Sequence, residues 1–308
     1  MTLYAHKTSN IRKTWLLFTL FLVVVIFIGW LFSQIYGNSS ILYFAVIFSV
    51  LMNIFAYWFS DKIVLKMANA IPVKKEEMPE LYNIVENLSI TAGLPTPKIY
   101  FIKEKQPNAF ATGRNPKHAV VAVTEGLLER LDKNELEGVI SHELSHIGNR
   151  DILVSTVVVV LAGFISILSD IFLRSFFWGR NSKGGEGRTQ VIFMIIGIVL
   201  AILAPISAML IRLAISRKRE LLADASGALL TRYPEGLANA LRKISSDSMP
   251  MKTANNTTAH LWFTDPFSAR GGSAFSEKEK NKTSWLHSLF MTHPPTEERI
   301  KALQRMKI

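Results

Sequence analysis

Two long stretches without a formal charge constrain this chain more than any other feature of its sequence. They run from Trp15 to Phe32 and from Ile41 to Phe59, and each has about the length of an α-helix that crosses a bilayer core. A buried helix of a soluble domain rarely keeps so long an uncharged stretch, and no small-residue cleavage site follows the first one. Residues 1–60 are therefore predicted to form a retained transmembrane hairpin.

Basic residues flank this hairpin and contribute to the net charge of +11; they are Lys7, Arg12, Lys13, Lys62, Lys66, Lys74 and Lys75. The connection from Ser33 to Ser40 carries no charge, so the positive-inside rule predicts that both flanks face the cytoplasm. No nucleic-acid-binding motif with interleaved aromatic residues accompanies the basic residues. We therefore expect contact with the lipid bilayer and no nucleic-acid partner.

Two further apolar runs, from Ile152 to Leu173 and from Val191 to Ile211, predict a second hydrophobic hairpin over residues 151–211. Their connection carries four basic residues and one acid, which is unfavourable for export; these are Arg174, Arg180, Lys183, Arg188 and Glu186. The hairpin therefore either crosses the bilayer despite its connection, or lies partly in the interface or under protein. Hydropathy favours the crossing.

The segments before and after the second hairpin, residues 61–150 and 212–308, have the composition of a soluble domain in two parts. In the first part, strands are predicted over Lys98–Ile102 and His118–Val123, with Asn108–Gly113 between them. In the second part, the polar stretch Ser245–Ser284 predicts a mobile loop. The expected fold is α+β and mainly helical: an integral membrane protein with two hydrophobic helical hairpins and a cytoplasmic domain that contains a small sheet.

The most informative helix is predicted to begin after Asp132, because Asp132 and Glu135 have the spacing of a capping box. It runs to about Gly148 and contains His142-Glu143-Leu144-Ser145-His146. The four-residue spacing places both imidazoles one turn apart on one face, where they can bind the same metal ion. An apolar stripe beside them predicts that the pair borders the core; it consists of Val139, Ile140, Leu144 and Ile147.

A catalytic zinc site uses three protein ligands and a water molecule, and without any cysteine in the chain the third ligand must be His, Asp or Glu. Glu220 is the candidate, with Asp224 one turn further along the same predicted helix. Asp224 is suited to accept the outer N–H of a liganding histidine and so to fix its orientation. The alternative for both acids is a surface ion pair with a neighbour such as Arg217. Small residues would let this helix approach the first one closely: Ala223, Ala225, Gly227 and Ala228.

With these residues the chain resembles the membrane-bound zinc metalloproteases of the HtpX type, relatives of the CAAX prenyl endopeptidases. The resemblance rests on His142-Glu143-x-x-His146 and Glu220-x-x-x-Asp224, separated by one hydrophobic hairpin and preceded by another. Two shorter motifs support it: Asn108-Ala109-Phe110-Ala111-Thr112-Gly113, and His293-Pro294-Pro295 followed by Arg299. The resemblance covers nearly the whole chain. It implies a zincin-type domain in a multi-pass protein of the bacterial inner membrane that cleaves misfolded or damaged membrane proteins.

The expected chemistry follows from the ligand count. One zinc ion per chain, held by His142, His146 and Glu220, would acidify a bound water molecule, and Glu143 would take its proton as general base. The segment that resembles the strand edging the family's cleft would pair with the main chain of a peptide through Asn108, Ala109, Phe110 and Ala111. Candidates for oxyanion stabilisation are His293 and Arg299, which could equally belong to a helix-start turn and a structural ion pair.

Two other functions remain open. A prenyl-protein endopeptidase is the nearest enzymatic alternative, although four hydrophobic runs are few for a larger helical chamber. A non-enzymatic metal-binding membrane protein, such as a transporter, would place ionisable residues within its spanning segments, whereas Asp170 is the only acid in the apolar runs. The expected substrates are unfolded polypeptides or membrane proteins, and the sequence indicates no particular oligomeric state.

Overall fold

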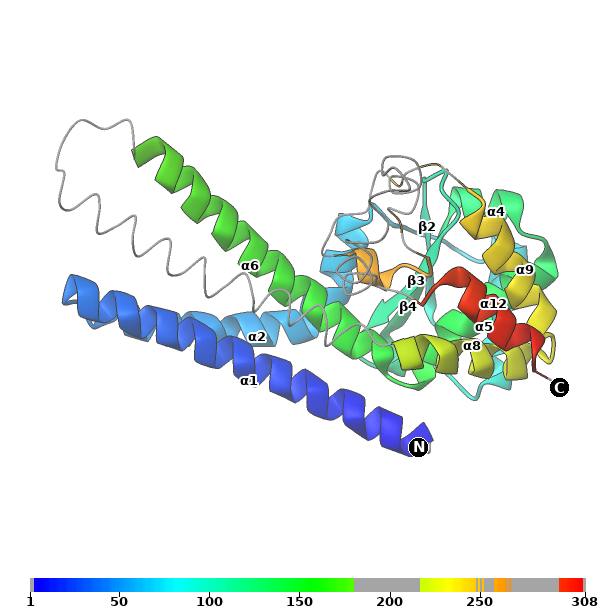
Figure 1. Cartoon of the computed structure of the whole chain (residues 1–308), viewed down its shortest axis with the longest axis horizontal. Coiled ribbons are helices and arrows are strands. Elements are labelled where there is room, and N and C mark those ends of the chain that lie inside the picture. The colour runs from blue at the N-terminus through cyan, green and yellow to red at the C-terminus, as the bar shows by residue number, and fades with distance from the viewer. Residues whose placement is uncertain are drawn as a thin grey trace, which may run out of the picture.

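The computed structural model of the chain describes residues 3–179, 217–247, 249, 251, 258–264, 266 and 294–306. Its first two elements, α1 (Leu3–Tyr36) and α2 (Ser40–Met67), are long helices that lie side by side (Figure 1). Large apolar side chains on them are exposed, for example Trp15 at 67% and Phe44 at 69%. Within the described residues, these are the two single helices long and apolar enough to cross a membrane. The predicted N-terminal hairpin of apolar helices is confirmed.

The sheet and the shorter helices form the compact part of the molecule, which is called the globular part (Figure 1). A third long helix, α6 (Asp151–Gly179), extends from the globular part beside α1 and α2. Its Val154 and Val157 belong to one buried apolar cluster with Leu17 and Phe21 of α1. The first half of α6 therefore packs with the N-terminal hairpin. Crossing of the membrane by the second hairpin stays a prediction, because residues 191–211 lie outside the described part of the chain.

The globular part contains one four-stranded sheet with the strand order β1-β2-β4-β3. β2 and β4 are parallel, and the two outer pairs are antiparallel. The strands are β1 (Ile71–Pro72), β2 (Lys98–Ile102), β3 (Ala109–Gly113) and β4 (Ala119–Thr124). The predicted small sheet is confirmed, and β1 is an additional strand too short to leave a pattern in the sequence. β3 is an edge strand, so one side of its main chain faces partners other than β4.

Helices surround the element that carries the two histidines, α5 (Lys133–Gly148). α5 begins at the predicted capping box, in which the side chains of Asp132 and Glu135 each accept a hydrogen bond from the other residue's amide. All four residues of its predicted apolar stripe are buried in the main core. The other helices of the globular part are α3 (Pro79–Thr91), α4 (Glu125–Arg130), α8 (Arg217–Thr231), α9 (Pro234–Ser245) and α12 (Thr296–Gln304), with short 3-10 turns η1 (Pro116–His118) and η2 (Ala259–Leu261).

Two glycines allow α8 and α9 to approach α5 closely. A Cβ atom at Gly138 of α5 would lie 2.7 Å from the amide nitrogen of Leu237 in α9. A Cβ atom at Gly227 of α8 would lie 2.9 Å from the amide nitrogen of His142. Non-bonded heavy atoms in favourable contact are roughly 3.5–4.0 Å apart, so neither position has room for a side chain. The predicted close approach of the second motif's helix is confirmed at Gly227.

We expect Gly138→Ala to lower the free energy of unfolding of the globular part by about 1–3 kcal/mol, because an added methyl group must displace α9 from a packed interior. Gly148→Ala is the matched control on the same helix. Its Cβ would meet nothing closer than Leu94 at 3.8 Å, and alanine favours a helix over glycine by about 1 kcal/mol. Thermal unfolding of the purified variants in detergent measures both effects, and equal midpoints would contradict the packing argument.

Candidate metal centre

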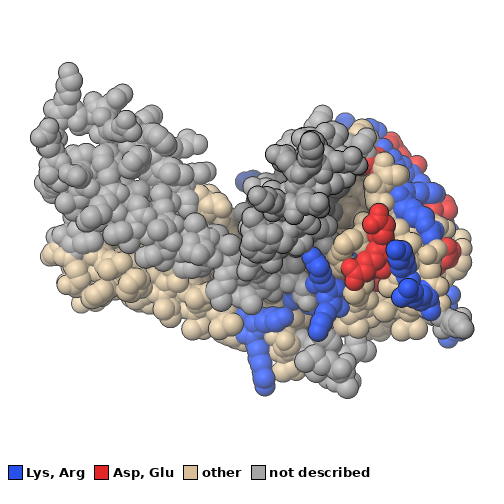
Figure 2. Space-filling model, viewed as in Figure 1, with Lys and Arg blue, Asp and Glu red and all other residues tan. Residues whose placement is uncertain are grey.

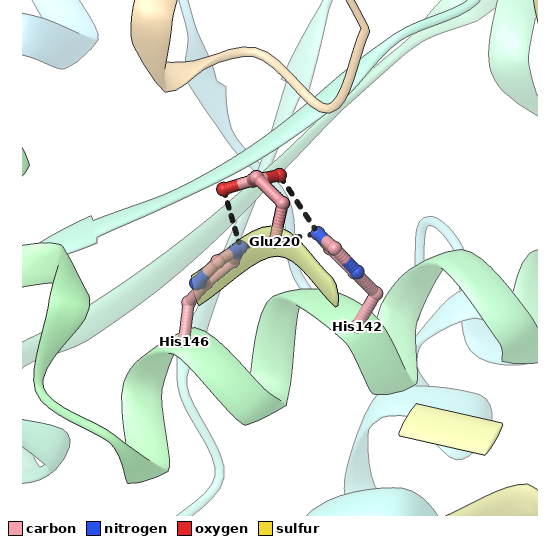
Figure 3. A group of neighbouring side chains, drawn as sticks. All are labelled: His142, His146 and Glu220. Atoms are coloured by element: carbon pink, nitrogen blue, oxygen red, sulfur yellow. Dashed lines mark hydrogen bonds and ion pairs between the residues drawn. The ribbon is translucent and has the colours of Figure 1, made fainter. Parts of the chain in front are cut away.

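His142 and His146 lie on one face of α5 with their rings turned toward a common point (Figure 3). Their Nε2 atoms are 3.1 Å apart, in keeping with the four-residue spacing on a helix. Glu220, in the first turn of α8, faces them: its carboxylate oxygens lie 3.7 Å from Nε2 of His142 and 3.6 Å from Nε2 of His146. The structure thus brings together the three residues that the sequence nominated as ligands.

This donor set fits a metal ion. Zinc binds imidazole nitrogen and carboxylate oxygen at about 2.0–2.2 Å in tetrahedral geometry, which places neighbouring ligand atoms roughly 3.3 Å apart. The separations of 3.1, 3.6 and 3.7 Å between the donor atoms are close to that value. Within the described part of the chain, this is the one group of three metal-binding side chains whose ligand atoms all lie within 4.8 Å of one another.

A carboxylate holds the outer nitrogen of each histidine. Nδ1 of His142 lies 2.9 Å from Oδ1 of Asp224, and Nδ1 of His146 lies 3.0 Å from Oδ2 of Asp151. Because each carboxylate can accept a hydrogen bond from Nδ1–H, the Nε2 lone pairs are left for a metal ion. Asp224 therefore has the contact that the sequence predicted for it, whereas Asp151 was not among the predicted site residues.

The two histidines have different electrostatic surroundings. Burial lowers the pKa of His142 to about 4, and the Asp224 carboxylate offsets this only in part. Burial also lowers the pKa of His146, but the negative charges of Glu220 and Asp151 outweigh it and raise the pKa to about 9. The surroundings therefore favour one positive charge on His146. A metal cation can provide this charge in place of the proton, which it must displace to bind.

Glu143 lies beside this group and not in it. Its side chain is buried, and this burial raises its pKa to about 7, with a further contribution from the charge of Glu220. The main chain of Ala111 in β3 lies against the Glu143 carboxylate and opposes this rise in its pKa. Glu143, Ala111 and the three candidate ligands line one cavity of about 30 Å³, which is large enough for a water molecule. A carboxyl group with this pKa can exchange a proton with such a water near neutral pH.

Arg299 of α12 is buried and directed at Asp224 and not at the cavity. Its Nε and Nη2 atoms donate to the two oxygens of Asp224 at 2.8 and 2.7 Å, and Nη1 donates to the carbonyl oxygen of Phe263 at 3.0 Å. Burial raises the pKa of the Asp224 carboxyl, but the charge of Arg299 outweighs this and lowers it to about 2. The geometry supports the structural ion pair for Arg299 and gives no support to an oxyanion role. His293 lies outside the described residues.

Comparison with known families adds to this geometry. Residues 75–307 match the model of peptidase family M48. The chain belongs to this family. The protein named Protease HtpX homolog from Caldanaerobacter subterraneus subsp. tengcongensis is 46% identical over 100% of this chain and 99% of its own length. Those from Thermoanaerobacter pseudethanolicus and Thermococcus sibiricus are 47% and 46% identical, over 99% and 89% of this chain and 98% and 89% of their own lengths.

Among solved structures, the crystal structure of S. mikatae Ste24p is 20% identical with a TM-score of 0.49, over 97% of this chain and 67% of that chain. This likeness is too low to support an argument about function. Family membership and the two apolar helices establish a membrane-bound metallopeptidase that acts on polypeptides. They also confirm the resemblance to HtpX-type proteases that the two sequence motifs indicated.

His142, His146 and Glu220 are called the metal group. In this M48 peptidase, residues that the motifs did not include connect the metal group to the N-terminal hairpin. The side chain of Asn10 in α1 donates to Oδ1 of Asp151 at 2.6 Å and to the carbonyl oxygen of Asn149 at 3.1 Å. Arg219 of α8 lies 3.6 Å from the same Asp151 carboxylate. The available signal was a lone acid directly after the helix of His146, but a charge at the start of an apolar run is too common to single out.

A short segment, residues 258–264, covers the metal group and is called the covering segment. The amide of Phe263 donates to the carbonyl oxygen of Ala109 in β3 at 2.8 Å. The side chain of Asn108 bonds to both the amide and the carbonyl oxygen of Thr264, at 3.2 and 3.0 Å. The covering segment therefore occupies part of the outer edge of β3, where the sequence predicted that a peptide substrate would pair.

The covering segment is held by buried aromatic residues. The rings of Phe263 and His142 meet edge to face with centres 5.0 Å apart, and the Trp262 ring packs in the same way on Phe110. The predicted mobile loop is therefore wrong for residues 258–264, because a short apolar sequence inside the polar stretch is buried in the core. His260 of this segment also lines the metal cavity; a lone histidine in a polar stretch gave no sequence signal.

We expect Asp151→Asn to weaken metal binding about 10–100-fold, because the carboxylate that orients the His146 ring and raises its basicity is lost. The control is Asp247→Asn, which removes an ion pair with Arg130 and does not touch the metal cavity. Titration of both purified variants and the parent with a competing chelator gives the three affinities. Unchanged affinity in Asp151→Asn would show that His146 does not depend on this carboxylate.

Proposed function

We propose that the chain is a zinc endopeptidase of the bacterial inner membrane that cleaves misfolded or damaged membrane proteins. The observation that carries the chemistry is the group of His142, His146 and Glu220 beside a cavity that Glu143 also lines. Catalytic zinc sites have three protein ligands and keep one position for water or substrate, whereas structural sites have four. Three donors next to an open cavity therefore favour a catalytic site.

In the proposed mechanism, His142, His146 and Glu220 hold the zinc ion, and Asp224 and Asp151 keep the two imidazole rings in the binding orientation. When bound by these residues, zinc would supply Lewis-acid chemistry: a lower pKa of a bound water molecule and polarisation of the scissile carbonyl group. Glu143 takes a proton from the attacking water and later passes it to the leaving amine. Its pKa of about 7 lets it both accept and return this proton near neutral pH.

β3 is the proposed binding edge for the substrate main chain, a mode of pairing that tolerates many sequences. Its outward-facing groups at Ala109 and Gly113 are already bonded, to the amide of Phe263 and to Oγ1 of Thr156. The cavity beneath has room for water but not for a peptide. A peptide that pairs along β3 must therefore displace the covering segment, or pair only near Ala111, next to Glu143.

The quality-control role is supported by similarity to relatives named Protease HtpX homolog and by the contacts between the metal group and membrane helices. Asp151 binds His146 and is also the first residue of α6, which packs along the N-terminal hairpin. Such an arrangement supports a catalytic site close to the bilayer surface, where membrane-protein substrates are accessible. The basic residues flanking the hairpin support the cytoplasmic orientation.

Glu143→Gln is expected to keep its metal and fold while losing roughly 10²–10⁴-fold in turnover, the usual contribution of a positioned general base. Glu137→Gln, the same change on the same helix but outside the cavity, is the control. Hydrolysis of unfolded casein in detergent, together with metal analysis, tests both variants. Near-normal proteolysis by Glu143→Gln would show that Glu143 is not the general base. Full activity of the parent after chelation would show that catalysis does not require zinc.

The proposed orientation predicts that a reporter domain inserted near Asn149 behaves as cytoplasmic, because the basic flanks of the hairpin stay on that side. A reporter inserted at Asn38, between α1 and α2, should behave as exported. The measurement uses two reporter domains at each position, one that is active only in the cytoplasm and one that is active only after export. Export of the Asn149 fusion would reverse the orientation.

A further inference from the structure

A second cavity lies where the N-terminal hairpin meets the globular part. Its volume is about 550 Å³, within the roughly 300–1,000 Å³ range of small-molecule sites. α1 lines it with six residues between Ile11 and Leu22, α2 with four between Asn53 and Trp58, and α6 with Leu153. None of its lining residues lines the metal cavity.

The lining of this second cavity is mainly apolar and aromatic, and part of it is open to the outside. Ile54 is 52% exposed and Trp58 is 50% exposed, on a helix that is long and apolar enough to cross the membrane. Tryptophan and tyrosine concentrate at the level of lipid headgroups, and Trp15, Tyr57 and Trp58 all line the cavity. The cavity therefore lies at the membrane interface, where a lipid can enter from the side.

The globular part contributes two arginines to the lining. Arg114 follows β3, and Arg150 lies at the corner between α5 and α6. The Arg114 guanidinium stacks on the Trp58 ring at 4.4 Å and donates to a main-chain carbonyl at 3.4 Å. Nε of Arg150 is buried and has no hydrogen-bond partner among the described residues. The adjacent acid, Asp151, is engaged by Asn10 and His146. Within the described part of the chain, neither arginine forms an ion pair.

The backbone gives no reason for an arginine at the corner. Arg150 has φ +58°, a left-handed conformation that glycine and asparagine adopt more readily. The wider surface is also basic at this junction. On the face shown in Figure 2, Lys and Arg side chains lie where the long helices meet the globular part, and the visible acidic side chains lie farther out on the globular part. Both observations point to a negatively charged ligand at Arg150.

We propose that the second cavity binds an anionic phospholipid, with its phosphate between Arg114 and Arg150 and an acyl chain against Phe18 and Leu22 of α1. The combination of an apolar cavity and two guanidinium groups that form no ion pair within the described residues matches an amphiphile with a negative headgroup. Inorganic phosphate would leave the apolar lining without a partner. An apolar segment of a polypeptide would leave the arginines without an anion. This site is independent of the peptide-bond chemistry at the metal group.

The test is a native mass-spectrometry titration of the full-length protein in detergent with phosphatidylglycerol or phosphatidylcholine of identical acyl chains. Each basic residue near an anionic lipid contributes about a fivefold factor in affinity. The double variant Arg114→Gln/Arg150→Gln should therefore lose roughly 30-fold in phosphatidylglycerol affinity and bind both lipids equally. The matched control is Arg12→Gln/Lys62→Gln, which removes the same charge from two exposed residues of α1 and α2 outside the cavity and should keep the preference.

Two further variants test the position of the lipid. Thr19→Trp should reduce binding of both lipids, because the larger side chain fills the apolar part of the cavity. Arg150→Gly should lose as much affinity for phosphatidylglycerol as Arg150→Gln, although glycine relaxes the backbone at this position. Equal affinity of the parent for the two lipids, or equal losses in the cavity and control variants, would overturn the proposal. Displacement of phosphatidylglycerol by millimolar inorganic phosphate, or by an uncharged apolar peptide, would assign the cavity to that competitor instead.

Discussion

The hydrogen bonds that Nδ1–H of His142 and His146 donate to Asp224 and Asp151 are the interactions on which the rest of this structure depends. Placing a carboxylate in the interior costs several kcal/mol unless cations and donors satisfy it. Asp224 is satisfied by the two-pronged contact with Arg299 of α12. Asp151 is satisfied by Asn10 of α1, with Arg219 of α8 nearby. Side chains of four helices, α1, α6, α8 and α12, thus come together behind the two histidines of α5, where the carboxylates need partners.

The same network makes the membrane hairpin a part of the site and not only an anchor. α5 and α6 meet at 82°, and the residues of this corner point in different directions. Asp151 lines the metal cavity, whereas Arg150 lines the second cavity, where the N-terminal hairpin meets the globular part. Asn10 bonds to the corner from the hairpin side. The N-terminal hairpin therefore contacts, through Asn10, the carboxylate that orients the candidate metal ligand His146.

The covering segment gives the proposed substrate edge a partner within the chain. Phe263 pairs with Ala109, its carbonyl oxygen accepts from Arg299, and its ring lies on His142. One residue thus contacts the edge strand, the ion pair behind the first histidine and the histidine itself. A peptide substrate that pairs along β3 as proposed would have to compete with Phe263 for the carbonyl group of Ala109.

The sequence alone determined those features that depend on neighbours along the chain. Helical spacing placed His142 and His146 on one face, the capping box placed the start of α5, β-branched runs placed β2 and β4, and uncharged length placed the N-terminal hairpin. Only the tertiary structure decided which side chains meet across long separations. Asn10 and Asp151 are 141 positions apart, Asn108 and the partner of its side chain, Thr264, are 156 apart, and Arg299 meets Asp224 across 75. Periodicity and capping act within a few residues, whereas these contacts depend on the direction in which each helix returns, which is set by packing of whole elements.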